Sequence, residues 1–289
     1  MPLRGFVGLL QTAAAALSAP GLGRAAGGAF ALANLGEMGL AMEAAPSLGA
    51  ALSIFCRAFA AVQSDSQLEL RHEDGGAALR YRILDPDVWP RDQDAEFTMT
   101  ILAGLVARVA GRGWRPQRLA LEHRPQEAEA PREAAWRCPV RHGAAWNALE
   151  FPAGLLDQPM PARAPDAFRQ LARDLAAQAA ERRQGAPLLL RVRREVLARL
   201  GEGEATQGAV AEALGRSERS LRRQLQAEGA AFSDVLADCR CDLARLMLAQ
   251  GSLSTAEIAA RLGYSDATAF ERAFRRRAGL TIAAARRGG

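Results

Sequence analysis

A short pattern of helix, glycine turn and second helix occurs twice in the last part of the chain. Each copy places two apolar residues at helical spacing, then a glycine, then a serine: Val210, Leu214, Gly215 and Ser217 in the first copy, and Ile258, Leu262, Gly263 and Ser265 in the second. Glycine accepts the positive φ of a tight turn. Ser217 can cap the helix that follows the first turn, and Ser265 or Asp266 can cap the one after the second. The repeat therefore predicts two helix-turn-helix units.

The second helix of each unit carries the apolar pair that closes its small core. Leu221 and Leu225 form this pair in the first copy, where we expect them to face Val210 and Leu214. In the second copy the pair is phenylalanine, at positions 270 and 274, one residue later than strict repetition would place it. The repeat is genuine in its order of residue types, but its spacing is not strict.

A long amphipathic helix is predicted between the two units. The segment 232–250 has apolar residues at helical spacing, which are Phe232, Val235, Leu236, Cys239, Leu243, Leu246 and Met247. A helix of this length extends about 28 Å, close to the ~34 Å that separates successive major-groove faces of a DNA duplex. The helix is therefore suited to present both units to one side of DNA.

The excess positive charge lies entirely in this part of the chain. Residues 184–289 contain 17 Arg against 12 Asp and Glu, whereas residues 1–183 contain 20 of each, so the net charge of +5 belongs to the repeats. Basic residues attract the phosphate backbone through counterion release, which gives affinity without sequence preference. Because the chain has no lysine, arginine richness partly reflects its general composition, and the placement of the arginines is the stronger evidence.

These motifs together resemble the DNA-binding domain of the AraC/XylS regulators over about residues 188–287. The matching residues are Leu214-Gly215-x-Ser217, Glu228-Gly229, Ile258-Ala259-x-x-Leu262-Gly263-Tyr264, Phe270-x-x-Ala273-Phe274-x-Arg276 and Gly279, together with the long helix. The family usually continues with a Ser/Thr-Pro pair and an aromatic-Arg pair. This chain instead has the segment from Thr281 to Arg286 without proline or an aromatic residue, which leaves the packing of the last short helix open.

The resemblance implies which side chains read DNA. It assigns base-edge readout to Arg219, Arg222 and Arg223 in the first unit, and to Ala267, Thr268, Glu271 and Arg272 in the second. Arginine can bond guanine in a bidentate manner, glutamate can accept from cytosine N4, and threonine or alanine can touch a thymine methyl. The second unit has fewer donors, so we expect the first to carry more of the specificity. Arg275, Arg276 and Arg277 are expected to contact phosphates or water.

The upstream half predicts an α+β domain. We expect helices at 48–59 and 95–111, strands at 68–73, 77–83, 118–123 and 148–151 with a hairpin turn at Asp74-Gly75-Gly76, a proline-rich stretch at 152–165 and a helix at 166–183. The segment 184–187 then marks a joint. The predicted organisation is thus an α+β domain of residues 1–183, followed by an all-α DNA-binding domain of residues 184–289.

The upstream half also resembles the arabinose-binding-type effector domain of one branch of the AraC family, over about residues 30–160. The resemblance rests on Leu35-Gly36-x-x-Gly39, Ser47-Leu48-Gly49-x-Ala51-Leu52, Trp136-x-Cys138-Pro139-Val140-Arg141-x-Gly143-Ala144, Asn147-x-Leu149-x-Phe151-Pro152 and Leu155-Leu156. It implies that this half binds a small effector, dimerises, or does both. The candidate pocket residues are Trp89, Glu96, Trp114 and Trp136, because indoles give apolar walls and a carboxylate could hold a cationic ligand.

Neither catalysis nor a cofactor or metal site is predicted. His72, His123 and His142 are far apart in the sequence and have no metal-ligand spacing, and neither a nucleophile elbow nor a phosphate loop is found. The four cysteines also lack paired metal spacing. No segment approaches the ~18 apolar residues that span a bilayer. We therefore expect a cytoplasmic, nucleoid-associated protein that is not an enzyme.

The leading interpretation is an effector-responsive transcription activator that acts on a nearby operon. Its expected partners are promoter half-sites in double-stranded DNA, RNA polymerase, a small-molecule effector and a second copy of the chain. Two alternatives stay open. One is a non-specific, nucleoid-type DNA binder, and the other is a DNA-repair protein that carries an AraC-like reading module.

Overall fold

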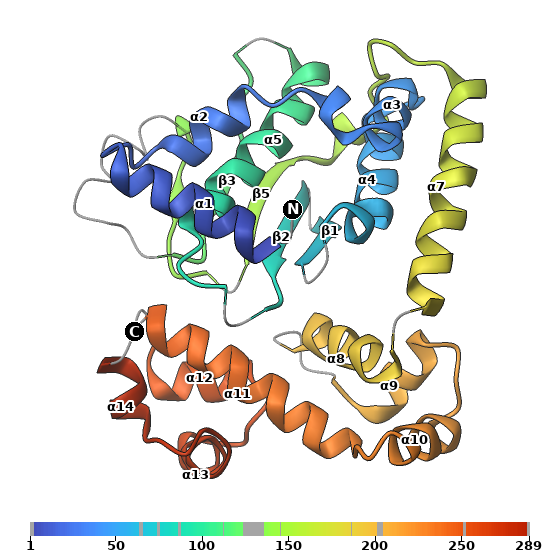
Figure 1. Cartoon of the computed structure of the whole chain (residues 1–289). Coiled ribbons are helices and arrows are strands. Elements are labelled where there is room, and N and C mark those ends of the chain that lie inside the picture. The colour runs from blue at the N-terminus through green and yellow to red at the C-terminus, as the bar shows by residue number, and fades with distance from the viewer. Residues whose placement is uncertain are drawn as a thin grey trace. The chain divides into compact units, whose positions relative to one another are not determined.

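The computed structural model describes residues 3–63, 66–73, 76–85, 88–111, 113–123, 136–144, 146–185, 187–200, 205–250 and 253–287. Internal contacts divide the chain into two units, Met1–Arg182 and Arg183–Gly289 (Figure 1). The first unit contains a sheet with helices, and the second is all-α with two helix-turn-helix units joined by a long helix. The predicted fold class is thereby confirmed.

The sheet of the first unit has five strands in the order β1-β2-β5-β3-β4. Their bounds are Ser66–Glu73 for β1, Gly76–Ile83 for β2, Arg118–Ala120 for β3, Val140–Arg141 for β4 and Asn147–Pro152 for β5. The three pairs β1–β2, β2–β5 and β3–β5 are antiparallel, and β3–β4 is parallel. Of the predicted hairpin turn, Asp74 and Gly75 lie outside the described residues. Strand β4, which is only two residues long, was not predicted.

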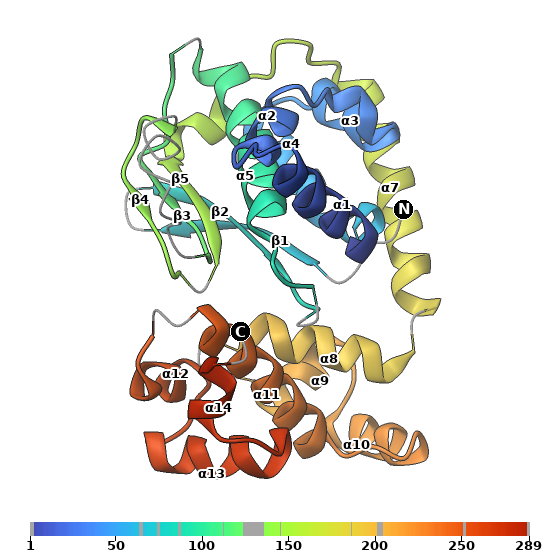
Figure 2. The same ribbon diagram turned by 60° about the vertical axis from the view of Figure 1, so that its left-hand side comes forward.

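Helices gather on one face of this sheet, as Figure 2 shows. Helix α4 (Leu48–Val62) packs on β1, and α5 (Asp92–Ala110) packs on β2 and β5. The Ser47 side chain accepts a hydrogen bond from the Ala50 amide and so caps α4. The core between helices and sheet includes the buried side chains Leu52, Phe55, Leu79, Tyr81, Leu102, Leu149 and Phe151. A further helix, α7 (Pro165–Gly185), adds Phe168 and Leu175 to this core.

The first 44 residues form helices that the sequence analysis did not predict. They are α1 (Leu3–Ala16), α2 (Leu22–Gly28), the 3-10 helix η1 (Leu32–Leu35) and α3 (Glu37–Ala44). The glycines of α2 allow it to lie directly against α5. A Cβ at Gly23 would stand 2.0 Å from the Gln93 carbonyl oxygen, and one at Gly27 would stand 2.5 Å from that of Phe97. Glycine weakens a helix locally, yet Gly23 and Gly27 are the positions at which α2 approaches α5 most closely.

The second unit is built around one long helix. Its helices are α8 (Leu188–Arg199), α9 (Gln207–Ala213), α10 (Glu218–Ala227), α11 (Phe232–Gln250), α12 (Thr255–Arg261), α13 (Ala267–Ala278) and α14 (Ile282–Arg287). Helix α11 has the predicted bounds and contacts α8, α13 and α14. Helix α8 was not predicted, although Leu188, Val192 and Val196 recur at every fourth position and are all buried.

Candidate nucleic-acid interface and effector cavity

The two turns of the second unit have the same backbone geometry. Gly215 has a φ of 66° and Gly263 a φ of 74°, in the left-handed region that glycine adopts without strain. The residue after each glycine donates its amide to a carbonyl of the preceding helix: Arg216 to Ala211 at 2.9 Å, and Tyr264 to Ala259 at 3.0 Å. Both glycine turns predicted from the sequence are therefore present, with the same φ region and the same amide bond back to the preceding helix.

The helix caps explain why the repeat is not strict. Ser217 accepts from the Ser220 amide at 3.2 Å and begins α10 two residues after its glycine. Asp266 accepts from the Ala269 amide at 2.7 Å and begins α13 three residues after its glycine. The Ser265 hydroxyl donates to the Asp266 carboxylate rather than capping. Hydrogen bonds from the Ala269 amide and from Ser265 lower the pKa of Asp266, so the cap is charged at neutral pH.

Each unit buries the expected apolar cluster beneath its second helix. In the first unit Val210, Leu221 and Leu225 are fully buried, whereas Leu214 is only half-buried. In the second unit the corresponding residues, Ile258, Leu262, Phe270 and Phe274, are all buried. The larger phenylalanine side chains close the second cluster more completely.

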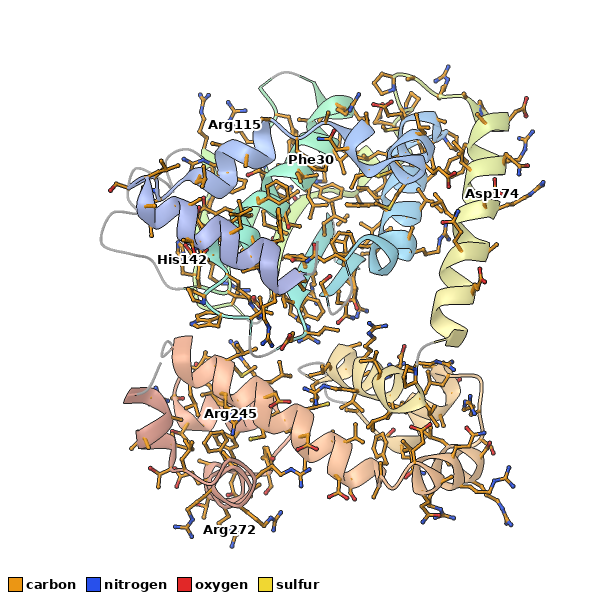
Figure 3. The ribbon with its side chains drawn as sticks, viewed as in Figure 1. Phe30, Arg115, His142, Asp174, Arg245 and Arg272 are labelled. Atoms are coloured by element: carbon orange, nitrogen blue, oxygen red, sulfur yellow. The ribbon has the colours of Figure 1, made fainter. Side chains whose placement is uncertain are left out.

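The predicted reading residues lie on the opposite, solvent-exposed face of each second helix. Arg219, Arg222 and Arg223 are exposed on α10, at i, i+3 and i+4. Thr268, Glu271 and Arg272 are exposed on α13. When Phe270 and Phe274 are aligned with Leu221 and Leu225, these three residues align with the three arginines of α10 in the same order. Ala267 is half-buried at the start of α13. Figure 3 shows Arg272 projecting from α13 away from the rest of its unit.

The three arginines at the end of α13 differ in their surroundings. Arg277 donates two hydrogen bonds to Asp238 on α11, at 2.6 and 2.5 Å, and these bonds raise the pKa of Arg277. This pair ties α13 to the long helix, while the Arg277 side chain stays 39% exposed at the surface. Arg276 is exposed at the edge of the reading face. Arg275 faces a cavity shared with α14.

The last helix forms one wall of this open cavity without the family's proline and aromatic residue. The cavity has a volume of about 490 Å³ and is lined by Thr255, Thr268, Glu271, Arg272, Arg275, Thr281, Ile282, Ala283 and Arg286. The Thr281 hydroxyl accepts from the Ala284 amide at 3.2 Å, and Arg286 donates to the Leu253 carbonyl at 2.7 Å. The Thr281 bond caps α14 itself, and the Arg286 bond ties α14 to the segment before α12.

The first unit contains a cavity of about 520 Å³ beside α2 and α5. It is lined by Arg24, Gly27, Gly28, Phe30, Leu32, Thr100, Ile101, Ala103, Gly104, Leu105, Ala107, Arg108, Trp114, Arg115, Pro116, Trp136 and Arg137. Trp114 and Trp136 were among the predicted effector residues, and the structure brings them together. Trp89 and Glu96 do not line this cavity: Trp89 lies beside Arg91, and Glu96 is buried on α5. The four arginines were missed, because they come from separate segments of the sequence.

The histidines and cysteines, for which the sequence predicts no metal site, also have defined surroundings in the structure. His123 and His142, which are distant in the sequence, stack edge to face with ring centroids 5.4 Å apart, and His142 Nδ1 lies 3.1 Å from the His123 carbonyl. Within the described residues no group of three His, Cys, Asp or Glu side chains could hold a metal ion. Burial raises the pKa of Cys56 and of Cys239 to about 12. Among the residues that the structure describes, no helix is both long and apolar enough to cross a bilayer.

Two family descriptions match the chain. The arabinose-binding N-terminal domain of AraC transcription regulators matches residues 1–160, and a helix-turn-helix domain matches residues 210–288. The first match covers the sheet and the helices before α7, and the second runs from within α9 through α14.

Several transcription regulators are similar to this chain over nearly its whole length. The ornithine utilization regulator of Pseudomonas aeruginosa is 30% identical over 272 residues, which cover 94% of this chain and 80% of that protein. The transcriptional regulator VirS of Mycobacterium tuberculosis is 28% identical over 283 residues, covering 97% and 83%. The crystal structure of the regulator CdpR from Pseudomonas aeruginosa aligns with a TM-score of 0.47 at 24% identity, covering 93% of this chain and 87% of that one.

Proposed function

Because the chain belongs to the AraC family of transcription regulators, we propose that it controls a promoter in response to a small molecule bound by its N-terminal domain. The protein is a sequence-specific DNA-binding transcriptional regulator. The observation that carries the proposal is the pair of helix-turn-helix units with matching turns, each with an exposed polar face on its second helix.

We infer that the first unit supplies most of the base recognition. Arg219, Arg222 and Arg223 together present the planar donor groups that suit guanine O6 and N7. The corresponding positions of the second unit carry Thr268, Glu271 and Arg272, with Ala267 beside them. This face offers fewer hydrogen-bond donors. Its glutamate repels the phosphate backbone but can accept a hydrogen bond from the cytosine N4 amino group. Arg276, at the edge of the reading face, is assigned to a phosphate.

We further propose that the protein works as a homodimer on adjacent half-sites and activates transcription by recruiting RNA polymerase. An effector can alter this arrangement only if it binds the two states of the dimer with different affinity. We expect such a regulator to act in the cytoplasm, because its target is chromosomal DNA.

The two alternative functions are less well supported. A non-specific binder gains nothing from an exposed glutamate in the centre of a reading face, since Glu271 repels the phosphate backbone of every sequence alike. A repair protein that accepts alkyl groups needs a reactive thiolate. Burial raises the pKa of Cys56 to about 12 and also raises that of Cys138, so both thiols of the first unit are protonated at neutral pH.

Replacing single arginines separates base readers from phosphate contacts. Arg222→Ala is expected to weaken binding to the specific site by ~1–3 kcal/mol and to relax the preference at one base pair, because a bidentate contact to guanine is lost. Arg276→Ala is expected to weaken specific and random DNA by about the same factor, because a phosphate contact carries no sequence information. Titrations of both variants on specific and scrambled duplexes at one salt concentration measure the two effects. If both changes lower specific and random binding equally, the assignment of α10 as a reading helix is wrong.

A further inference from the structure

We propose that the cavity beside α2 and α5 binds an amphiphilic anion, a molecule with a flat apolar body and one carboxylate or phosphate head. The inference rests on the proposed function, since it names the class of effector that the N-terminal domain would take. It also reverses the charge expected from the sequence, where Glu96 suggested a cationic ligand. Glu96 is buried elsewhere on α5 and does not line the cavity.

The charge of the cavity points to an anion. Four arginines, Arg24, Arg108, Arg115 and Arg137, line it, and the described lining contains neither aspartate nor glutamate. Arg108 contacts Glu43 at 3.1 Å, but the two side chains are 43% and 35% exposed, so water screens this pair. Arg115 donates one hydrogen bond to the Trp114 carbonyl at 2.6 Å. That bond fixes one nitrogen of its guanidinium, whose planar fork matches a carboxylate or phosphate.

The remaining walls of the cavity are apolar and aromatic. Trp114, Trp136 and Phe30 contribute flat rings, and Ile101 and Leu105 of α5 contribute aliphatic surface. Figure 3 shows Phe30 and Arg115 in the part of the domain where α2 and α5 lie. A volume of about 520 Å³ falls within the range of small-molecule sites. The combination of apolar walls and clustered arginines suits a ligand that is apolar at one end and anionic at the other.

The backbone at Arg137 gives independent support. This residue has a φ of 54°, one of two positive values among the described residues other than glycine. Such a conformation is costly for a residue with a side chain, and strained residues of this kind cluster at ligand sites. Arg137 directly follows Trp136, so the strained residue places a cation and an indole side by side at the cavity.

A set of ligands with one body and different heads tests the proposal on the full-length protein. The probes are 4-phenylbutanoate, 4-phenylbutyl phosphate, 4-phenylbutanol and 4-phenylbutylamine, with binding followed by tryptophan fluorescence and by calorimetry. We expect saturable binding of at least one anion, about tenfold or more tighter than the alcohol, because a charge-assisted contact is lost. The amine is expected to bind most weakly. The carboxylate and phosphate arms identify the preferred head.

Three variants assign that binding to this cavity. Gly104→Leu extends a side chain from α5 where an added Cβ meets no atom within 4 Å, so we expect it to narrow the cavity and weaken anion binding about tenfold or more without lowering the melting temperature. Arg115→Gln removes a cation from the lining and is expected to weaken the anion about tenfold while leaving the alcohol unchanged. Arg57→Gln is the matched control, because Arg57 is exposed on α4 outside the cavity.

Two results would overturn the proposal. One is that no anion binds saturably, or that the alcohol or amine binds as tightly as both anions. The other is that Gly104→Leu keeps its fold and binds the anion like the parent protein. Neither result touches the proposed function, which depends on specific DNA binding measured separately. If the protein bound the anion but showed no sequence-specific DNA binding, the proposed function would instead be wrong, and the inference about the cavity would stand.

Discussion

Phe270→Ala is expected to destabilise the DNA-binding unit by about 3–5 kcal/mol and to remove the second half of its DNA contact. Phe270 is 1% exposed and stacks against Tyr264 and Phe274, with ring centroids 5.5 and 5.8 Å away. Truncating it leaves a cavity beneath α13, and the reading face of that helix loses its support. Affinity for a site that spans both units should fall at least about a hundredfold, the equivalent of ~2.8 kcal/mol.

Denaturant unfolding and nuclease protection measure the two parts of this prediction. Leu280→Ala is the control, because Leu280 is 36% exposed in the same unit and its truncation should cost under ~0.5 kcal/mol. If Phe270→Ala loses stability as expected but protects both half-sites as before, then the second unit does not contribute to DNA binding in the way described.

Arg91→Ala is expected to destabilise the first unit by about 3–5 kcal/mol, because it leaves a buried carboxylate without its partner. Arg91 and Glu122 are 4% and 5% exposed. The Arg91 guanidinium donates to the two Glu122 oxygens at 3.1 and 3.2 Å, and to the Ile83 carbonyl at 3.0 Å. Asn147 donates to Glu122 at 3.2 Å. Loss of the arginine therefore disrupts a group of contacts that joins the start of α5 to the sheet.

Thermal and urea unfolding of the full chain test this prediction against a surface pair. Arg4 contacts Asp85 at 3.3 Å, with 63% of the arginine side chain exposed, so Arg4→Ala should cost at most ~1 kcal/mol. The double variant Arg91→Ala with Glu122→Ala should be less destabilised than the sum of the two single changes, because the second substitution removes the stranded charge. Equal effects of Arg91→Ala and Arg4→Ala would show that the buried pair is hydrated.

The sequence predicts the second unit well because its signals are local. The glycine turns, the cap at Ser217 and the apolar stripe of α11 each involve residues within one or two helical turns, so spacing alone locates them. The one irregularity, the later phenylalanine pair, follows from a cap at Asp266 in place of Ser265. Helix α8 has the same kind of local pattern and could have been predicted from it.

The first unit is harder to predict because its decisive contacts are distant in the sequence. Gly23 marks a weak helix locally, yet it is the residue that lets α2 meet α5 at the Gln93 carbonyl, 70 positions away. Prediction of the residues that line the cavity is limited in the same way. Residue type singles out Trp89, Trp114 and Trp136 alike, and of these the fold brings Trp114 and Trp136 to one cavity. Arg24 and Arg137 come together only through the fold.

The most direct test of the central claim is selection of binding sites from a random duplex library by the full-length protein, at near-physiological salt and with excess competitor DNA. Two reading units held by α11 predict an enriched motif with two conserved blocks whose centres lie about 10 bp apart, one helical turn. Arg222→Ala should lose the preference at one position of one block. Recovery of sequences with no enriched motif, at an affinity equal to that for random DNA, would contradict the account and favour a non-specific DNA binder.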